Sequence, residues 1–424
     1  MNILNRKLSL DPLLATIVFH ACIVRLMYVP GYNAIATFLC AFLLLTMLPK
    51  LRILFGRTYA RVNLILLAMS FAMVLSSVFN GYNLDGTLLF IARINLLTWY
   101  LELQARKGKL REVAMVFFLC SAAYLLTTWW FILSDPLRAW RSDSYYLVGS
   151  KFSVSYLCLF GLVMYAISFG RGKHKTFSFL VFAGMCILSI LLIIRVDCTT
   201  GVFGITLLIT LVALRNALES SLRSPAFYVG TSLVATFVLV LFSEAITHIG
   251  FVADFITDFL GKSITLTGRS YVYEHVLPFL AQSPLLGNGY NSVYVLFDGQ
   301  MTFSATGYAL NAQNAILEYC LYFGIVGVLL LYWFICHILS VARSQLSGGE
   351  SWRGYIALAG LYVLTLLGMV EITINVQFFA YLAFYYALSV GCADARAGEG
   401  RAVAEMRGKG IPATEHSMRL GLYE

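Results

Sequence analysis

The sequence predicts an all-α protein that crosses a membrane about twelve times. Of its 424 residues, 60% are hydrophobic and only 12% are charged, and the mean hydropathy is +0.80. A spanning helix needs about 20 mostly apolar residues to cross roughly 30 Å of hydrocarbon, and the chain has room for about a dozen such helices. Little of it remains for a separate soluble domain, so the composition indicates a polytopic membrane protein.

Apolar runs long enough to span a bilayer recur along the chain. The first follows Arg6 and Lys7, as a signal peptide would, but no small-residue cleavage site separates it from the next run, so we expect a retained span. Pro30 and Gly31 predict a tight turn between the first two spans. The predicted spans are residues 11–29, 31–48, 62–79, 86–104, 113–133, 153–170, 176–194, 200–214, 226–243, 314–341, 355–373 and 375–392.

The basic residues are distributed unevenly between alternate loops. With the N-terminus in the cytoplasm, most of the 30 Lys and Arg residues fall in cytoplasmic loops, as the positive-inside rule requires. The formal net charge of +9 is therefore a topology signal rather than a sign of nucleic-acid binding. The sequence predicts a multi-pass membrane protein with both termini cytoplasmic. Most of its nine cysteines lie in or beside apolar segments, so no disulfide or metal framework is expected.

One predicted outer loop is much longer than the other connections, and long loops usually carry function. Phe251, Phe255 and Phe259 recur every four residues, which predicts an interfacial amphipathic helix within Ser243–Lys262. A helix that only covers the bundle is the alternative. The domain organisation that we expect is nine spans in residues 1–243, the long outer loop in 244–313, three spans in 314–392 and a disordered cytoplasmic tail in 393–424.

Several kinds of chemistry lack their sequence signatures. The chain has no P-loop, no HExxH, no paired CxxC and no DxD-type carboxylate pair in a predicted cytoplasmic loop. These absences argue against an ATP-driven pump and against an enzyme that binds a nucleotide-sugar through a metal. We expect neither a metal nor a cofactor.

The strongest candidate for an anion site is Arg269, in the sequence Thr267-Gly268-Arg269-Ser270 before a helical stretch that ends at Gln282. Free N–H groups in the first turn of a helix bind anions, and a guanidinium group matches the oxygens of phosphate. A structural ion pair of Arg269 with Glu274 or Asp258 is the alternative. Glu274 and His275 are the nearest titratable groups for proton transfer, although His275 could equally be an ordinary surface histidine.

Other candidates lie at predicted outer ends of spans. Arg195 and Asp197 form a short polar break between two apolar helices, which is typical of a cavity lining. Arg195 could instead snorkel or pair with Asp197. Arg93 is an intramembrane charge and hence a candidate binding residue. Gln313 and Asn314 lead into a span, where they could bind substrate or serve as no more than a helix cap.

Three groups of residues occur in a recognisable order. They are Thr267-Gly268-Arg269-Ser270, then Ser283-Pro284-Leu285-Leu286-Gly287-Asn288-Gly289-Tyr290, then Gln313-Asn314-Ala315-Ile316-Leu317-Glu318 with Phe323-Gly324-Ile325-Val326-Gly327. In this order and at this place in the topology, they resemble the O-antigen polymerase/ligase family of bacterial inner-membrane glycosyltransferases, in which a "TGR", a "P-x-x-G-x-G" and an "HN-x-x-L-E…G-x-x-G" follow one another. Each motif alone is weakly specific, but the three motifs in this order are more specific.

The resemblance implies a metal-independent transfer of a glycan from undecaprenyl diphosphate to a sugar hydroxyl at the periplasmic face. The family's loop arginine corresponds to Arg269 and would bind the diphosphate, and a second family arginine corresponds less closely to Arg195. Where ligases of the family carry histidine, this chain has Gln313, whose amide cannot accept a proton. Glu274, His275 and Asp197 are then the candidate bases, unless deprotonation is late and weakly catalysed.

This departure favours a polymerase of undecaprenyl-diphosphate-linked oligosaccharide repeat units, which would act in the membrane with a possible chain-length-determining co-polymerase and no nucleic acid. A ligase that transfers polymer to lipid A core is the nearest alternative. A lipid-linked oligosaccharide flippase is the alternative from another class. Against it stand the few charges deep in spans, the lack of a visible inverted repeat and the single dominant loop.

Overall fold

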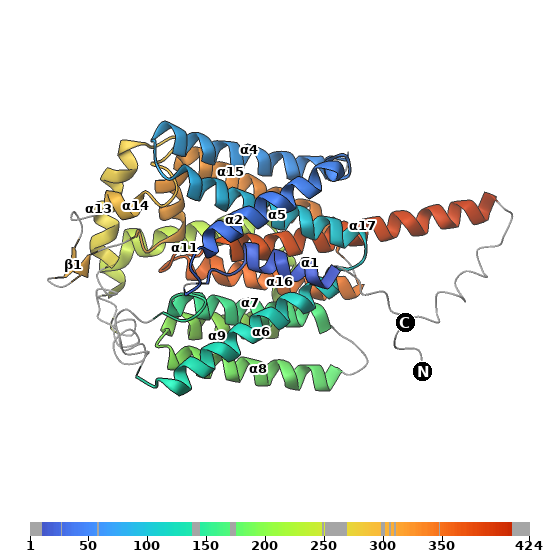
Figure 1. The fold of residues 1–424 in the computed structure, drawn as a ribbon, viewed down its shortest axis with the longest axis horizontal. Coiled ribbons are helices and arrows are strands. Elements are labelled where there is room, and N and C mark those ends of the chain that lie inside the picture. The colour runs from blue at the N-terminus through green and yellow to red at the C-terminus, as the bar shows by residue number, and fades with distance from the viewer. Residues whose placement is uncertain are drawn as a thin grey trace.

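The computed structural model describes residues 11–26, 28–56, 59–137, 145–169, 175–247, 250, 269–297, 302–304, 307–308, 311–346 and 348–408. Within them the fold is helical except for one short hairpin. Most of the long helices run along the same axis and pack side by side, while α13 and α14 lie at one end of the bundle and α17 projects beyond the other end (Figure 1).

The helices of the first half are α1 (Asp11–Cys22), α2 (Tyr32–Met47), the 3-10 turn η1 (Leu48–Lys50), α3 (Leu51–Leu54), α4 (Ala60–Phe79), α5 (Leu84–Arg106), α6 (Leu110–Ser134), α7 (Lys151–Phe169) and α8 (Lys175–Arg195). The second half contains α9 (Thr199–Ala213), α10 (Arg215–Leu222), α11 (Pro225–Thr247), α13 (Arg269–Gln282), α14 (Val293–Leu296), β1 (Thr302–Ser304), β2 (Gly307–Tyr308), α15 (Ala315–Gln345), α16 (Gly348–Leu367) and α17 (Val376–Gly408).

Seven helices among the described residues are long and apolar enough to cross a membrane, and up to eight if α9 and α10, bent by 99° at their junction, count as one span. The chain is thus an all-α, multi-pass membrane protein. The predicted twelve spans exceed this number, although a helix lies at every predicted position. Some of these helices are short, as α1 is with 12 residues, and others carry charges, such as Arg93 and Glu102 in α5.

Successive helices alternate in direction, so alternate connections gather at opposite ends of the bundle. At one end, here called the α13 end, Asn80 after α4 donates to Gly287 O at 2.8 Å, and Lys151 at the start of α7 pairs with Asp197 after α8. At the other, the α10 end, Arg223 after α10 donates to Ser351 in α16. The predicted topology, in which successive loops alternate between the two sides of the membrane, requires that the connections gather at the two ends in this way.

The centre of the bundle is formed by α16 and α17, which pack against each other and against α5, α7, α9 and α15. Their tyrosines are fully buried, and several donate hydrogen bonds to groups on neighbouring helices, as Tyr362 does to Leu222 O at 3.0 Å. An unpaired hydroxyl would be costly where water is absent. The bonds of Tyr355 and Tyr362 help to position α9 and α10 against α16.

Several helices differ from their predicted bounds, most clearly α1, which ends at Cys22 rather than at 29, and α16 and α17. The span predicted at 355–373 is α16, which ends at Leu367, and a non-helical turn then reaches Asn375. The predicted disordered tail begins at Ala393, but α17 continues to Gly408. Ala, Glu, Arg and Met, all strong helix formers, predominate in this stretch.

The long loop also contains the antiparallel pair β1 and β2, which was not predicted from the sequence. The helix predicted after Thr267-Gly268-Arg269 is present as α13. The phenylalanines of the predicted interfacial helix, and residues 409–424 of the tail, lie outside the described residues.

Candidate functional site

The segments that carry the candidate site residues converge at the α13 end of the bundle. α13 begins at Arg269 and also contains Glu274 and His275. The structure describes the backbone of these three residues, while their side chains lie outside its description. Tyr273 of α13 is buried, and its hydroxyl lies 3.1 Å from Gln313 O and 3.0 Å from Met369 O. One side chain thus joins the Arg269 helix to the turn before α15 and to the turn after α16.

Gln313 lies in the left-handed region, with φ of 50°. This conformation is uncommon for a residue other than glycine, and such outliers persist where the surroundings impose them, often at functional sites. The Gln313 N–H donates to Asn311 Oδ1 at 3.0 Å. Among the described residues we find no hydrogen bond of its side-chain amide.

Asn314 has the structural role that the sequence left open. It is the N-cap of α15, where its Oδ1 accepts from the N–H groups of Ile316 and Leu317 at 3.1 and 3.2 Å. Its Nδ2 donates to Thr236 O on α11 at 3.3 Å, and the residue is fully buried. Asn314 therefore fixes the start of α15 next to Gln313.

Glu318, in the first turn of α15, was not among the predicted site residues. Its carboxylate is buried and accepts hydrogen bonds from the Ala312 N–H, at 2.7 Å, and from the Tyr322 hydroxyl. Ala312 immediately precedes Gln313, so the Glu318 carboxylate binds the N–H group of one residue of the strained turn while the Tyr273 hydroxyl binds the carbonyl of the next. The sequence signal that could have identified Glu318 is an acidic residue in an otherwise apolar first turn of a predicted span.

The loop at Pro284–Gly289 docks on a break in α15. Gly324 interrupts the helix with φ of 64° and ψ of −171°, a combination that only glycine adopts readily. The freed N–H groups of Ile325 and Val326 donate to Pro284 O and Leu285 O, at 2.9 and 3.1 Å. A Cβ on Gly324 would lie 2.2 Å from Leu285 O. The second and third motifs of the sequence thus form one interlocked unit.

The break between α8 and α9 lies at the same end. Arg195 is exposed at the end of α8, and Asp197 has φ of 53°. Asp197 pairs with Lys151 at 3.3 Å, and the described residues include no ion pair between Asp197 and Arg195. Two residues into α9, Thr200 donates to Glu371 at 3.4 Å. Glu371 follows Met369 in the turn bound by Tyr273, so hydrogen bonds connect the break to the Gln313 turn.

Arg93 contacts α1 rather than the segments described above. Its Nε donates to Ala21 O of α1 at 2.9 Å, and its Nη2 is buried without a hydrogen-bond partner among the described residues. Burial raises the pKa of Tyr290, in the loop after α13, to about 12, and the positive charges of Arg93 and Arg25 oppose this rise. Phe90, on the same helix as Arg93, stacks on Tyr290 with ring centroids 4.9 Å apart, so α5 packs against the residue that follows the Pro284–Gly289 loop.

The arrangement combines a strained polar turn, two candidate arginine positions and several titratable groups at one end of a membrane bundle. Stabilising the charge of a departing phosphate group by preorganised cations would suit such a site. No group of three or more His, Cys, Asp or Glu residues in the described part of the chain is placed to hold a metal ion.

Comparison with protein families gives a match to the O-antigen ligase family over residues 184–332. The matched region runs from within α8 into α15 and contains all the candidate residues above except Arg93. Comparison with curated proteins finds no similar sequence. Residues 184–332 are therefore a domain of the O-antigen ligase and polymerase family, whose members are membrane enzymes that transfer lipid-linked glycans.

Proposed function

We propose that this protein polymerises undecaprenyl-diphosphate-linked oligosaccharide repeat units into a surface or exported polysaccharide. The observation that carries the proposal is the contact of Tyr273 with Gln313 and Met369, which brings the helix of Arg269 against a strained turn inside the matched family domain. The alternation of basic residues supports a topology of twelve spans in which the α13 end faces the periplasm and both termini face the cytoplasm.

In the proposed reaction, a hydroxyl oxygen of the acceptor glycan attacks the anomeric carbon of the donor glycan. The bond from that carbon to the diphosphate oxygen breaks, and undecaprenyl diphosphate leaves with the bonding electrons. Arg269 and Arg195 would bind the diphosphate and stabilise its growing charge. The acceptor proton would pass to Glu274, His275 or Asp197, or would leave late in the reaction. No metal is required by this scheme.

Gln313 and Asn314 have different parts in this proposal. The Gln313 amide would orient a sugar hydroxyl by donating and accepting hydrogen bonds. Asn314 would act through its cap, which fixes the turn. Arg93 would act from beside Tyr290, at the edge of the donor site.

The second candidate function is ligation of finished polymer to lipid A core, which the family description favours. Gln313 favours polymerisation over ligation because ligases of the family carry a histidine at this position. A flippase for lipid-linked oligosaccharide is the alternative from the transporter class.

Mass analysis of lipid-linked glycans in a deletion strain separates these functions. Loss of a polymerase leaves single repeat units on the outer leaflet or capped on core. Loss of a ligase leaves long polymer on undecaprenyl diphosphate, and loss of a flippase traps single units inside. Either of the last two outcomes would refute polymerisation.

Complementation of that strain with Tyr273→Phe tests the site itself. The variant removes the hydroxyl that joins α13 to the Gln313 turn, so we expect a clear fall in polymer at normal protein abundance. Tyr362→Phe is the matched control, since it removes a buried tyrosine hydroxyl that donates to a carbonyl away from the site. Equal polymer from both variants would contradict the proposed site.

A further inference from the structure

A pocket of about 410 Å³ lies at the α10 end of the bundle, far along the helices from the candidate site. This volume is within the range of small-molecule pockets, about 300–1,000 Å³. Its walls come from α7, α8, α9, α10 and the start of α16. Most of the lining is aromatic or aliphatic, and the polar groups include Ser178, Arg215 and Asn216.

The apolar wall of the pocket comes largely from aromatic side chains of α7 and α8. Tyr165 of α7 packs its ring on Phe169 and Phe182, with ring centroids 4.6 and 6.4 Å apart, and its hydroxyl donates to Ser178 O at 3.3 Å. Phe169 and Phe179 are 42% and 67% exposed. Exposed aromatic rings on two membrane helices make this wall accessible to a lipid chain.

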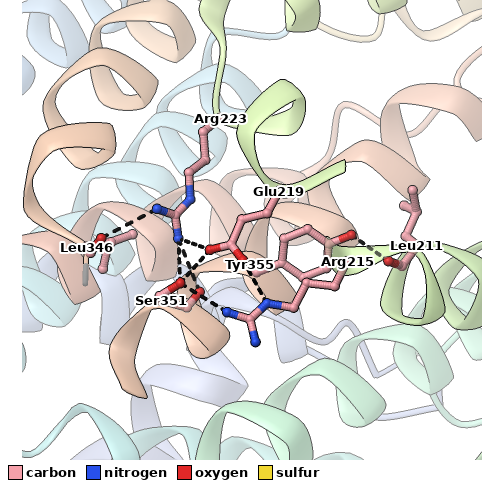
Figure 2. Close-up of polar contacts among 7 residues, drawn as sticks. All are labelled: Leu211, Arg215, Glu219, Arg223, Leu346, Ser351 and Tyr355. Atoms are coloured by element: carbon pink, nitrogen blue, oxygen red, sulfur yellow. Dashed lines mark hydrogen bonds and ion pairs between the residues drawn. The ribbon is translucent and has the colours of Figure 1, made fainter. Parts of the chain in front are cut away.

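Arg215, which lines the pocket, belongs to a cluster of two arginines, Glu219 and Ser351 (Figure 2). Arg215 Nε donates to Glu219 at 2.8 Å and its Nη2 to Ser351 at 3.1 Å, while Arg223 donates to the same two side chains at 2.6 and 2.9 Å. Burial raises the pKa of Glu219, but the Ser351 hydroxyl and the two arginines lower it more, and the net pKa lies below its ordinary value. Glu219 is therefore charged, and two guanidinium groups share one carboxylate.

Arg215 keeps one donor group for a ligand. Its guanidinium lies over the Trp352 ring, 5.2 Å from the centroid, which fixes its plane. Nη1 has no hydrogen-bond partner among the described residues, and in Figure 2 it points away from Glu219 and Ser351. Since Arg215 also lines the pocket, an excess positive charge with a free N–H donor borders an apolar cavity.

We propose that this pocket binds an anionic phospholipid from the leaflet at the α10 end, with an acyl chain against the rings of α7 and α8 and the phosphate on Arg215. The excess positive charge favours an anionic over a zwitterionic headgroup, and a guanidinium group binds phosphate oxygens directionally. Asn216 and Ser178 lie beside the proposed phosphate position.

The full-length protein in detergent is titrated with phosphatidylglycerol and with phosphatidylcholine of the same acyl chains, and bound lipid is counted by native mass spectrometry. We expect phosphatidylglycerol to bind about tenfold more tightly, as one charge-assisted hydrogen bond would give. Arg215→Gln should abolish this preference. Ala213→Trp should weaken both lipids because it fills the pocket and leaves the cluster intact.

Arg111→Gln is the matched control, because Arg111 is an exposed arginine at the same end, paired with Glu350 at 2.8 Å. It should bind both lipids as the wild type does. Any of three results would overturn the proposal. They are equal binding of the two lipids to the wild type, unchanged lipid binding by Ala213→Trp, and full displacement of phosphatidylglycerol by inorganic phosphate. The Ala213 variant decides the question even if Arg215→Gln does not fold.

Discussion

Replacing Gly324 by alanine tests whether the break in α15 holds the site together. A residue with a Cβ at this φ and ψ costs of order 1–3 kcal/mol. The new Cβ would also lie 2.2 Å from Leu285 O, so the Pro284–Gly289 loop must move. This movement threatens the two hydrogen bonds from Ile325 and Val326 to the loop, each worth about 1 kcal/mol. We expect a loss of about 3 to 5 kcal/mol in the free energy of unfolding.

The assay is thermal unfolding of the purified protein in detergent, together with polymer yield in the complemented deletion strain. Gly184→Ala in α8 is the matched control, because a Cβ there meets no atom within 4 Å and the backbone is helical. Alanine in a helix should be neutral or slightly stabilising. If Gly324→Ala unfolds at the same temperature as Gly184→Ala, the interlocking of loop and helix does not matter for stability.

Three further predictions concern single side chains. Arg269→Lys should lose most polymerising activity in complementation, because an ammonium group does not reproduce the two parallel hydrogen bonds of a guanidinium group to phosphate. Near-normal polymer from this variant would remove Arg269 from the site. Gln313→Ala should lose less activity than Arg269→Ala. Glu318→Ala should lower the unfolding temperature and the activity, since it leaves two buried donors unpaired at about 1–3 kcal/mol each; a stable, active variant would refute this role. The pKa of Glu219 is lowered, so its contribution to stability is present above the unfolded pKa of about 4.3 and is lost as the pH falls through the folded pKa. Glu219→Gln should therefore lack this acid-dependent decrease in melting temperature. Parallel plots of melting temperature against pH for the wild type and the variant would contradict this prediction.

Much of the candidate site could be predicted from sequence because its motifs are local. The helix after Thr267-Gly268-Arg269 is present as α13, and the polar residues before α15 include a helix cap. The contacts between these segments were not predictable, since Tyr273 bonds to residues 40 and 96 positions away. Nothing in the local pattern distinguishes Tyr273 from the many other tyrosines of the chain.

The partners of charged residues were also decided by packing. The sequence allowed Arg195 to pair with Asp197, its near neighbour, but Asp197 pairs with Lys151 of α7. The partners of Glu318 are local by contrast, since Tyr322 lies one turn later on α15 and Ala312 lies six residues earlier in the chain. A buried polar group without a partner is costly, and helix packing sets which partners from other helices are within reach.

The sequence by itself determined that the chain is helical, multi-pass and alternating in direction, because hydrocarbon excludes unpaired backbone groups and every span must be a run of apolar residues. Only the tertiary structure decided that α15 breaks at Gly324 to receive the Pro284–Gly289 loop, and that Arg215 and Arg223 both donate to Ser351 of α16. Hydropathy reports which residues leave water, whereas such contacts depend on distances between helices that the apolar pattern does not specify.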